Sequence, residues 1–426
     1  MPNPLPLARE GGKEHVDLIT EPFRGIGLRK SFMKKLILLF IPLCFFLGFM
    51  QGDDYRTLHF NALVVDTHND VVQRILNGED LSVRTKHGHS DLPRFKEGGL
   101  DVEMFSIWVP PEKKSVSYFK QANIQIDSIE SLARRNPDKM GIATSADQVE
   151  KLVGDGKFVG MFGMEGGHPI MNDLKNIDYF YKRGVRYMTL TWNNSTSWAT
   201  SAKDETDKKL KLKHKGLTEF GKKVVRRMNQ LGMMVDVSHV GEQTFWDVIH
   251  TSTKPVIASH SSSWTLAHNR RNLKDDQMKA LAKNGGVVFI NFAPWFIDST
   301  FGGREDAMKK RNQARIDSFT AHTTFPDDFT KENMIAEFLA DQYRPILPTL
   351  KQLIDHFDYA AKLIGADHVG IGSDFDGLSV VPLGMDDVTH LPLITRELLK
   401  RGYSPDDVKK ILGGNFMRVL RENEKK

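Results

Sequence analysis

The strongest constraint on the fold of this chain is an eightfold alternation between short apolar runs and segments with helical periodicity. The apolar runs cover residues 62–65, 102–109, 158–164, 187–191, 233–237, 256–259, 286–292 and 369–372. The runs are continuous rather than alternating, as is typical of parallel strands that are buried on both faces. Eight strand–helix units in one chain predict an α/β fold, a closed (β/α)8 barrel of the TIM type. An open doubly wound sheet is the alternative, but no glycine-rich dinucleotide fingerprint follows the first run.

Segments with apolar residues at intervals of three and four separate the runs, and these segments predict the helices of the barrel. They cover residues 117–134, 174–182, 217–231, 243–249, 275–282 and 350–364. The connection at 297–348, between the seventh and eighth runs, is much longer than the others and contains helical patterns at 307–319 and 331–342. Because connections of this length usually carry structure or function, we expect a helical insert that covers the active-site face or contacts another subunit.

The N-terminal region has the pattern of a secretory signal. Lys34 and Lys35 precede an apolar run from Leu36 to Met50, and a basic stub followed by roughly 15 apolar residues is typical of signal peptides. The run is short for a membrane span, which needs about 20 apolar residues, although an uncleaved anchor that tethers the chain to the membrane is the alternative. Residues 1–51 are therefore predicted to be an extension with a signal peptide or anchor. The catalytic part is expected outside the cytoplasm: periplasmic, secreted or membrane-anchored.

Composition limits the kind of site that the chain can build. Its single cysteine, Cys44, lies inside the N-terminal apolar run. An internal disulfide and a thiolate zinc site are thereby excluded, and any metal must be held by His, Asp and Glu. The net charge is +5, but no basic stripe is interleaved with aromatic residues, so we expect no nucleic-acid partner.

Histidines and carboxylates follow five of the predicted strands, at the end where barrel enzymes place their reacting groups. His68 and Asp70 follow the first strand, Glu165 the third, His239 the fifth, His260 the sixth and Asp374 the eighth. His and carboxylate ligands suit zinc, with bonds of about 2.0–2.2 Å. Glu165 is placed to bridge two metal ions, which can share a water when they lie about 3.5–4 Å apart.

Five motifs with these residues make the sequence recognisable. They are VVDTHND at 64–70, GMEGGHP at 163–169, DVSHV at 236–240, ASHSS at 258–262 with NRRN at 269–272, and GIGSDFDG at 370–377. The sequence resembles the membrane dipeptidases, also called renal dipeptidases, which are binuclear zinc peptidases with an amidohydrolase-type barrel. The likeness covers residues 58–422, which form the expected dipeptidase domain. It implies two Zn²⁺ ions per subunit, dipeptides as substrates and a homodimer.

The resemblance also implies a role for each motif residue. His68 and Asp70 match the ligands of one zinc, His239 and His260 match those of the second, and Glu165 matches the bridging carboxylate. Asp374 matches the aspartate that takes a proton from the bridging water and passes it to the leaving amine. Arg271 matches the arginine that binds the terminal carboxylate of the substrate, a task that suits a planar guanidinium. From their positions alone, Asp66 is expected to orient its turn or to support a ligand, His168 to be a loop residue or to support a ligand, and Asp376 to be structural.

One position departs from the family. Mammalian members carry a histidine after the fourth strand, where it contacts the carbonyl region of the substrate, and Trp192 stands at that position here. An indole N–H donates one hydrogen bond but carries no positive charge. Trp192 is therefore expected to contact the substrate and to change oxyanion stabilisation or specificity.

The sequence predicts an exported zinc-dependent dipeptidase that uses a hydroxide between its two metals. One alternative is another binuclear hydrolase of the same barrel, with an amide, lactone or β-lactam substrate. Lactonases and phosphotriesterases usually carry His-x-His at the first strand and a carboxylated lysine as the bridge, whereas this chain has His68, Asp70 and Glu165. The other alternative is an exported protein that binds metal without catalysis, and Trp192 is its only support.

Overall fold

The computed structural model describes residues 54–111, 116–325 and 328–425. All of these residues belong to one compact unit, Asp53–Lys426. The predicted extension at 1–51 lies outside the described residues, so its role as a signal or anchor stays a prediction. None of the helices in the described part of the chain is long and apolar enough to cross a membrane.

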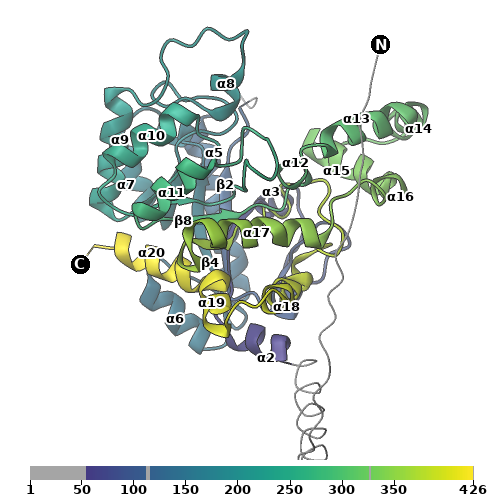
Figure 1. The fold of residues 1–426 in the computed structure, drawn as a ribbon, viewed down its shortest axis with the longest axis horizontal. Coiled ribbons are helices and arrows are strands. Elements are labelled where there is room, and N and C mark those ends of the chain that lie inside the picture. Colours follow the sequence, from purple (N-terminus) through teal and green to yellow (C-terminus); the bar gives the residue numbers. More distant parts are fainter. Residues whose placement is uncertain (1–53, 112–115, 326–327, 426) are drawn as a thin grey trace, which may run out of the picture. The chain divides into compact units, whose positions relative to one another are not determined.

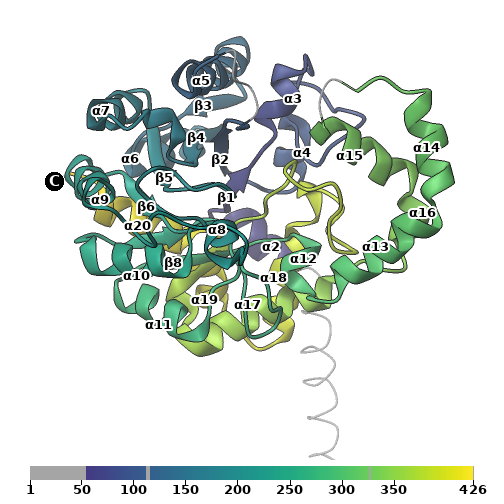
Figure 2. The same ribbon diagram turned by 90° about the horizontal axis from the view of Figure 1, so that it is seen from above.

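Eight parallel strands close into a barrel that is ringed by helices (Figure 2). In order around the barrel, the strands are β1 (Val65–Asn69), β2 (Val102–Trp108), β4 (Phe158–Glu165), β5 (Val185–Thr189), β6 (Met234–Asp236), β7 (Val256–Ala258), β8 (Val287–Ile290) and β9 (Val369–Ile371). The pairing of β9 with β1 completes the ring. The predicted (β/α)8 barrel is therefore confirmed.

Two details of the sheet differ from the sequence prediction. β1 begins where the predicted run at 62–65 ends and continues through polar residues to Asn69, because Asp66 pairs in register with Glu103 on β2 and with Ile371 on β9. A ninth strand, β3 (Met140–Ile142), pairs with the first residues of β4, and helix α6 (Ala146–Gly154) follows it. A strand of three residues is too short for its periodicity to be recognised in the sequence.

The helices around the barrel lie close to their predicted positions. They are α5 (Tyr118–Arg135), α7 (Leu174–Lys182), α9 (Glu219–Leu231), α10 (Glu242–Thr251), α11 (Asp275–Lys283) and α17 (Leu350–Ile364). Local chemistry fixes their ends. Thr349 and Gln352 form a capping box at the start of α17. Gly232 ends α9 with a φ of 87°, which a glycine adopts without steric cost.

The strands separate two apolar layers, because successive residues of a strand point to opposite faces. On β2, Val102 and Met104 point into the barrel, whereas Phe105 and Ile107 pack against the surrounding helices. The interior layer includes Phe416 from α20 (Asn415–Asn423), the last helix of the chain. The barrel is thus a packed core, and the ends of its strands are left to form a site.

The long connection between β8 and β9 forms the predicted helical insert. It contains α12 (Pro294–Ile297), α13 (Phe301–Arg311), α14 (Gln313–Ala321), α15 (Asp328–Phe338) and α16 (Ala340–Tyr343). The pattern at 307–319 is divided at Asn312, where α13 ends and α14 begins. Phe301, Met308 and Leu339 give the insert a small core of its own, and the insert lies to one side of the barrel (Figure 1).

Candidate active site

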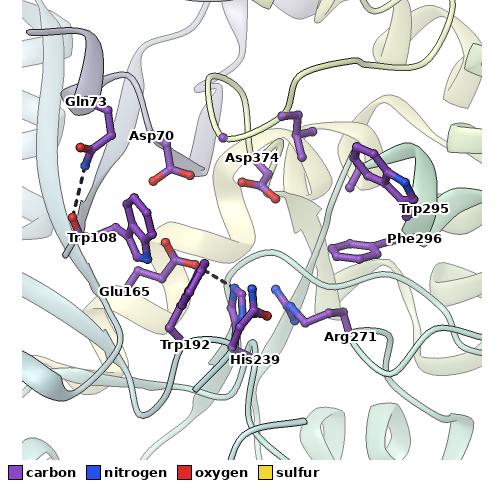
Figure 3. A pocket seen from close by; sticks show the side chains of 14 residues that line it. Asp70, Gln73, Trp108, Glu165, Trp192, His239, Arg271, Trp295, Phe296 and Asp374 are labelled. Carbon is purple, nitrogen blue, oxygen red and sulfur yellow. Dashed lines mark hydrogen bonds and ion pairs between the residues drawn. The ribbon is translucent and has the colours of Figure 1, made fainter. Parts of the chain in front are cut away.

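Six predicted site residues meet at the C-terminal ends of the barrel strands, and Figure 3 shows the four of them that line a cavity. Asp70, Glu165, His239 and Asp374 line one cavity, and His68 and His260 lie in the buried floor beside Glu165. The possible ligand atoms form two overlapping groups, each within 4.8 Å: His68, Glu165 and His260, and His68, Asp70 and Asp374. The described residues therefore contain a candidate metal site built from distant parts of the chain.

The two oxygens of Glu165 face different histidines. Its Oε1 lies 2.8 Å from Nε2 of His239 and 3.6 Å from Nε2 of His260. Its Oε2 lies 3.5 Å from Nε2 of His68, and this nitrogen is also 3.7 Å from Oδ2 of Asp70. Two ligands of one tetrahedral zinc, each about 2.0–2.1 Å from it, lie about 3.4 Å apart. The three distances of 3.5, 3.6 and 3.7 Å match this spacing on both sides of Glu165, whereas the 2.8 Å distance to His239 is that of a direct hydrogen bond.

Hydrogen bonds at the far ring nitrogens orient the histidines toward Glu165. Nδ1 of His68 donates to the Tyr187 hydroxyl at 2.9 Å, because that hydroxyl donates its own proton to the Thr67 carbonyl. Nδ1 of His260 donates to Oγ of Ser259 at 2.8 Å, and this hydroxyl donates to Asp236. The Nε2 atoms of His68 and His260 are buried and have no hydrogen-bond partner among the described residues. In its neutral form, each ring offers the lone pair of this nitrogen to a metal ion.

The protonation states also fit a cation. Burial lowers the pKa of His239 to about 4 and that of His260 well below its usual range, so both rings are neutral at pH 7. Burial alone would raise the pKa of Glu165, but the charge of His68 and hydrogen bonds from the histidines hold that pKa well below its usual range. Burial opposes the charge of His68, yet Tyr187, Glu165 and Asp70 together hold the pKa of His68 well above its usual range. Neutral imidazole and ionised carboxylate are the forms that bind metals, so a cation bound beside Glu165 would replace the second proton of His68.

Two of the site residues have a backbone conformation that side chains disfavour. His239 and Asp374 both have a φ of 65°, in the left-handed region that non-glycine residues seldom adopt. Next to them, Gly377 leaves space for the carboxylates. A Cβ at this glycine would lie 2.2 Å from Oδ2 of Asp70 and 2.5 Å from Oδ1 of Asp374. The turns after β6 and β9 thus hold reactive side chains in fixed, strained positions.

The cavity above this floor has a volume of about 220 Å³ and aromatic walls. Trp192 lies 5.1 Å from Trp108 and 6.3 Å from the ring of His239, measured between ring centroids. Trp295 and Phe296 from α12 form the opposite wall, and Trp108 and Trp192 lie beside Glu165 (Figure 3). Trp192 is thus part of the cavity wall, where the sequence places a substrate contact.

Arg271 is a buried cation at the end of this cavity. Its Nη2 donates to the His260 carbonyl at 3.2 Å, and its guanidinium lies 5.3 Å from the Phe296 ring. Burial lowers its pKa to about 10, so it remains charged at pH 7. Its Nε has no hydrogen-bond partner among the described residues, and no ion pair forms with any carboxylate of this part of the chain. Arg271 is therefore available to bind an anion.

The structure assigns supporting contacts that sequence reasoning could not place. Tyr187, Ser259 and Asp236 orient histidines, and Nδ2 of Asn291 donates to Oδ2 of Asp374 at 2.8 Å. Asp236 and Ser259 lie in the motifs DVSHV and ASHSS, which gave them no role, whereas Tyr187 and Asn291 have no sequence signal beyond their place on or after a strand. The three residues that were not expected to be ligands lie outside the metal-ligand groups. Asp66 accepts from the Ser373 amide, His168 contacts Asn194 and Asp376 pairs with Arg74.

A sequence model described as membrane dipeptidase (peptidase family M19) matches residues 53–426. The chain belongs to the membrane dipeptidase family. The resemblance that its motifs indicated is thereby confirmed, and the protein is a hydrolase of the peptidase class.

Among its relatives, Dipeptidase tcpJ of Claviceps purpurea (strain 20.1) is 30% identical over 374 residues, which cover 84% of this chain and 76% of that protein. Dipeptidase 3 of Rattus norvegicus is also 30% identical over 374 residues, which are 85% of this chain but 65% of the rat protein, just under two thirds.

Solved structures of a probable dipeptidase and of a metallo peptidase share the fold. The probable dipeptidase PvdM of Pseudomonas aeruginosa has a TM-score of 0.72 and 28% identity, over 88% of this chain and 98% of that chain. A metallo peptidase of Rhodobacter sphaeroides, liganded with a phosphinate mimic of the dipeptide L-Ala-D-Ala, has a TM-score of 0.68 and 25% identity. The match covers 85% of this chain and 99% of the Rhodobacter chain.

Proposed function

We propose that this protein hydrolyses the peptide bond of dipeptides with the help of two zinc ions. The observation that carries the proposal is the arrangement of Glu165, whose two oxygens face separate sets of metal-binding side chains. His68 and Asp70 would hold one ion, His239 and His260 would hold the other, and Glu165 would bridge them. Zinc bound in this way would polarise the scissile carbonyl and acidify the attacking water.

Asp374 is the group that moves the proton. Asn291 holds its Oδ2 at 2.8 Å, and its Oδ1 lies with the oxygens of Asp70 around Gly377. Burial raises the pKa of Asp374 to about 8, and cations beside it would lower that pKa toward the range where a carboxylate both accepts and returns a proton. Asp374 would thus take a proton from the attacking water and give it to the leaving amine.

Arg271 and the aromatic walls select the substrate. The unpaired guanidinium of Arg271 at the end of the cavity would bind the terminal carboxylate of a peptide. A peptide anchored there by its terminal carboxylate would place the bonds nearest that end in the cavity of about 220 Å³, beside the proposed metal ligands. Trp192 supplies an apolar face where mammalian members have a histidine, so the substrate's carbonyl region loses a cationic donor and gains packing area.

The proposal extends to location and assembly. The basic and apolar pattern at 34–50 supports export, with the catalytic domain outside the cytoplasm and a membrane tether if the signal is uncleaved. A homodimer is proposed from the family resemblance, and the insert from α13 to α16 is the candidate contact.

The test is dipeptide hydrolysis by the purified full-length protein, with a panel of L-L and L-D dipeptides. We expect turnover that a chelator abolishes and zinc restores, with about two zinc ions bound per chain. Asp374→Asn should retain zinc and lose most of kcat, whereas Asp386→Asn, an exposed carboxylate at the protein surface, should match the wild type. Zinc-loaded protein without dipeptide turnover would mean a different substrate, and absence of zinc binding would refute the metal site.

A further inference from the structure

A second cavity lies directly behind Arg271. It has a volume of about 420 Å³, and both His239 and Arg271 line it as well as the catalytic cavity. Its other walls come from α8 (Ala202–Thr206) and the loop after it, from the start of α10 and from the loop before α11. Arg271 therefore stands between two cavities, and a group bound to it from the catalytic side has the second cavity as its neighbour.

The second cavity carries more positive than negative charge. Lys215, Arg270, Arg271 and Lys274 line it, together with two carboxylates, Glu205 and Glu242. Glu242 pairs with Lys274 at 2.8 Å, and Glu205 accepts hydrogen bonds from Thr200 and the Gln243 amide. Among the described residues, no carboxylate forms an ion pair with the remaining three cations. With Glu205 as the one remaining carboxylate, these three cations leave the cavity with a net positive charge, which favours an anionic ligand.

The excess of positive charge includes one buried cation, Arg271, which has no anionic partner among the described residues. It is 6% exposed, its Nη2 binds a neutral carbonyl and its Nε binds no atom of the described residues. A buried charge without an anion is costly to maintain. The terminal carboxylate of a dipeptide would neutralise Arg271 alone. Arg270 and Lys215 are exposed to solvent, and they would keep a positive potential at the mouth of the second cavity.

We propose that Arg270 and Lys215 form a subsite for a second carboxylate, and that the preferred dipeptides have Asp or Glu as their second residue. This inference rests on the proposed dipeptidase function. The α-carbon of the second residue carries both the terminal carboxylate and the side chain. When Arg271 holds that carboxylate, the side chain is the part of the substrate nearest the second cavity. An acidic side chain at this position matches the charge of Arg270 and Lys215, and an amide of the same shape does not.

The first measurement compares kcat/KM for Ala-Glu and Ala-Gln, with the second residue in either the L or the D form. These substrates differ in one charge and hardly in shape. We expect a preference of about tenfold for Ala-Glu at low salt, weakening as salt screens the charges. In the double variant Arg270→Gln and Lys215→Gln, the preference should fall to about twofold or less. Lys209→Gln is the control, because this exposed lysine is on the same loop but does not line the cavity.

A binding measurement separates this inference from the proposed function. Titration calorimetry of zinc-loaded Asp374→Asn with Ala-Glu and Ala-Gln gives the same comparison without turnover. Hydrolysis of Ala-Ala by the wild type tests the dipeptidase activity, so either claim can fail alone. If Ala-Glu and Ala-Gln had nearly equal affinity and nearly equal kcat/KM, the proposed subsite would be refuted. A preference that survives both substitutions, or one that Lys209→Gln removes equally, would refute it as well.

Discussion

The hydroxyl of Tyr187 on β5 lies 2.9 Å from Nδ1 of His68 on β1. The hydroxyl donates to the Thr67 carbonyl and must accept from His68, so one tyrosine fixes both the tautomer and the orientation of a proposed zinc ligand. Tyr187 is completely buried. The side chain fits because Gly163 on β4 leaves the space, since a Cβ there would lie 2.0 Å from the phenol ring.

We therefore predict that Tyr187→Phe weakens zinc binding. Loss of such a supporting hydrogen bond typically costs about 10- to 100-fold in metal affinity. Competition with a chromogenic chelator measures that affinity, and added zinc should restore part of the activity. Tyr181→Phe on α7 removes a hydroxyl outside the site and should leave zinc affinity unchanged. Equal affinities in wild type and Tyr187→Phe would show that the hydrogen bond does not matter for the metal.

Gly377→Ala should inactivate the enzyme while the fold stays intact. The added methyl group would lie 2.2 Å from Asp70 and 2.5 Å from Asp374, so both carboxylates must move. A displacement of about 1 Å at reacting groups can cost about 100-fold in rate. Gly154→Ala on α6 is the matched control, because its methyl group would have no neighbour within 4 Å. If Gly377→Ala retained wild-type kcat/KM, the two carboxylates would not need their observed positions.

The sequence predicts the barrel well because all eight runs are apolar for one reason. Each strand is buried between the interior of the barrel and the surrounding helices. The proposed metal ligands can be predicted equally well. His68, Glu165 and His260 all follow predicted strands, and the C-terminal ends of barrel strands meet at one face of the fold. Family motifs add Asp374 and Arg271. These predictions depend on patterns within a few residues.

The remaining features depend on pairs of residues that are distant in sequence, and no local pattern marks them. The sequence around Tyr187 indicates only an apolar position in a strand, and the sequence around Asn291 indicates only a polar residue at the end of a strand. The cavity behind Arg271 exists only because α8, α10 and the loop before α11 converge. The polar half of β1 was also hidden, since Asp66 and His68 resemble a turn until their backbone pairing is seen.

The insert should contribute to substrate binding through Glu305 on α13. This carboxylate is 6% exposed and accepts from Nε1 of Trp295 and from the hydroxyl of Tyr343, both at 2.8 Å. Glu305 thus positions Trp295 in the cavity wall. Glu305→Ala should leave two donors unpaired, destabilise the protein by about 1–3 kcal/mol and raise KM more than it lowers kcat.

Glu305→Gln is the conservative variant, and it should recover part of the lost KM because an amide oxygen still accepts one of the two hydrogen bonds. Glu332→Ala removes an exposed carboxylate of the same insert and should change neither KM nor stability. An unchanged KM in Glu305→Ala would show that Trp295 keeps its position without this contact.

Acid should destabilise the protein through His356 on α17. Its Nδ1 accepts from the Ser263 amide and its Nε2 donates to the Ile297 carbonyl, so the fold requires the neutral ring. Burial lowers its pKa from 6.5 to about 4. Because the folded-state pKa lies below the unfolded one, the stabilisation is complete above pH 6.5 and is lost as the pH falls toward 4.

The loss between pH 7.5 and pH 5 should be about 2 kcal/mol for this group. Urea unfolding at both pH values measures it, and His356→Gln, whose amide can make both contacts, should lose about that much less stability on acidification. The exposed His322→Gln should behave as the wild type, and an equal pH dependence in His356→Gln would assign the acid sensitivity to other groups.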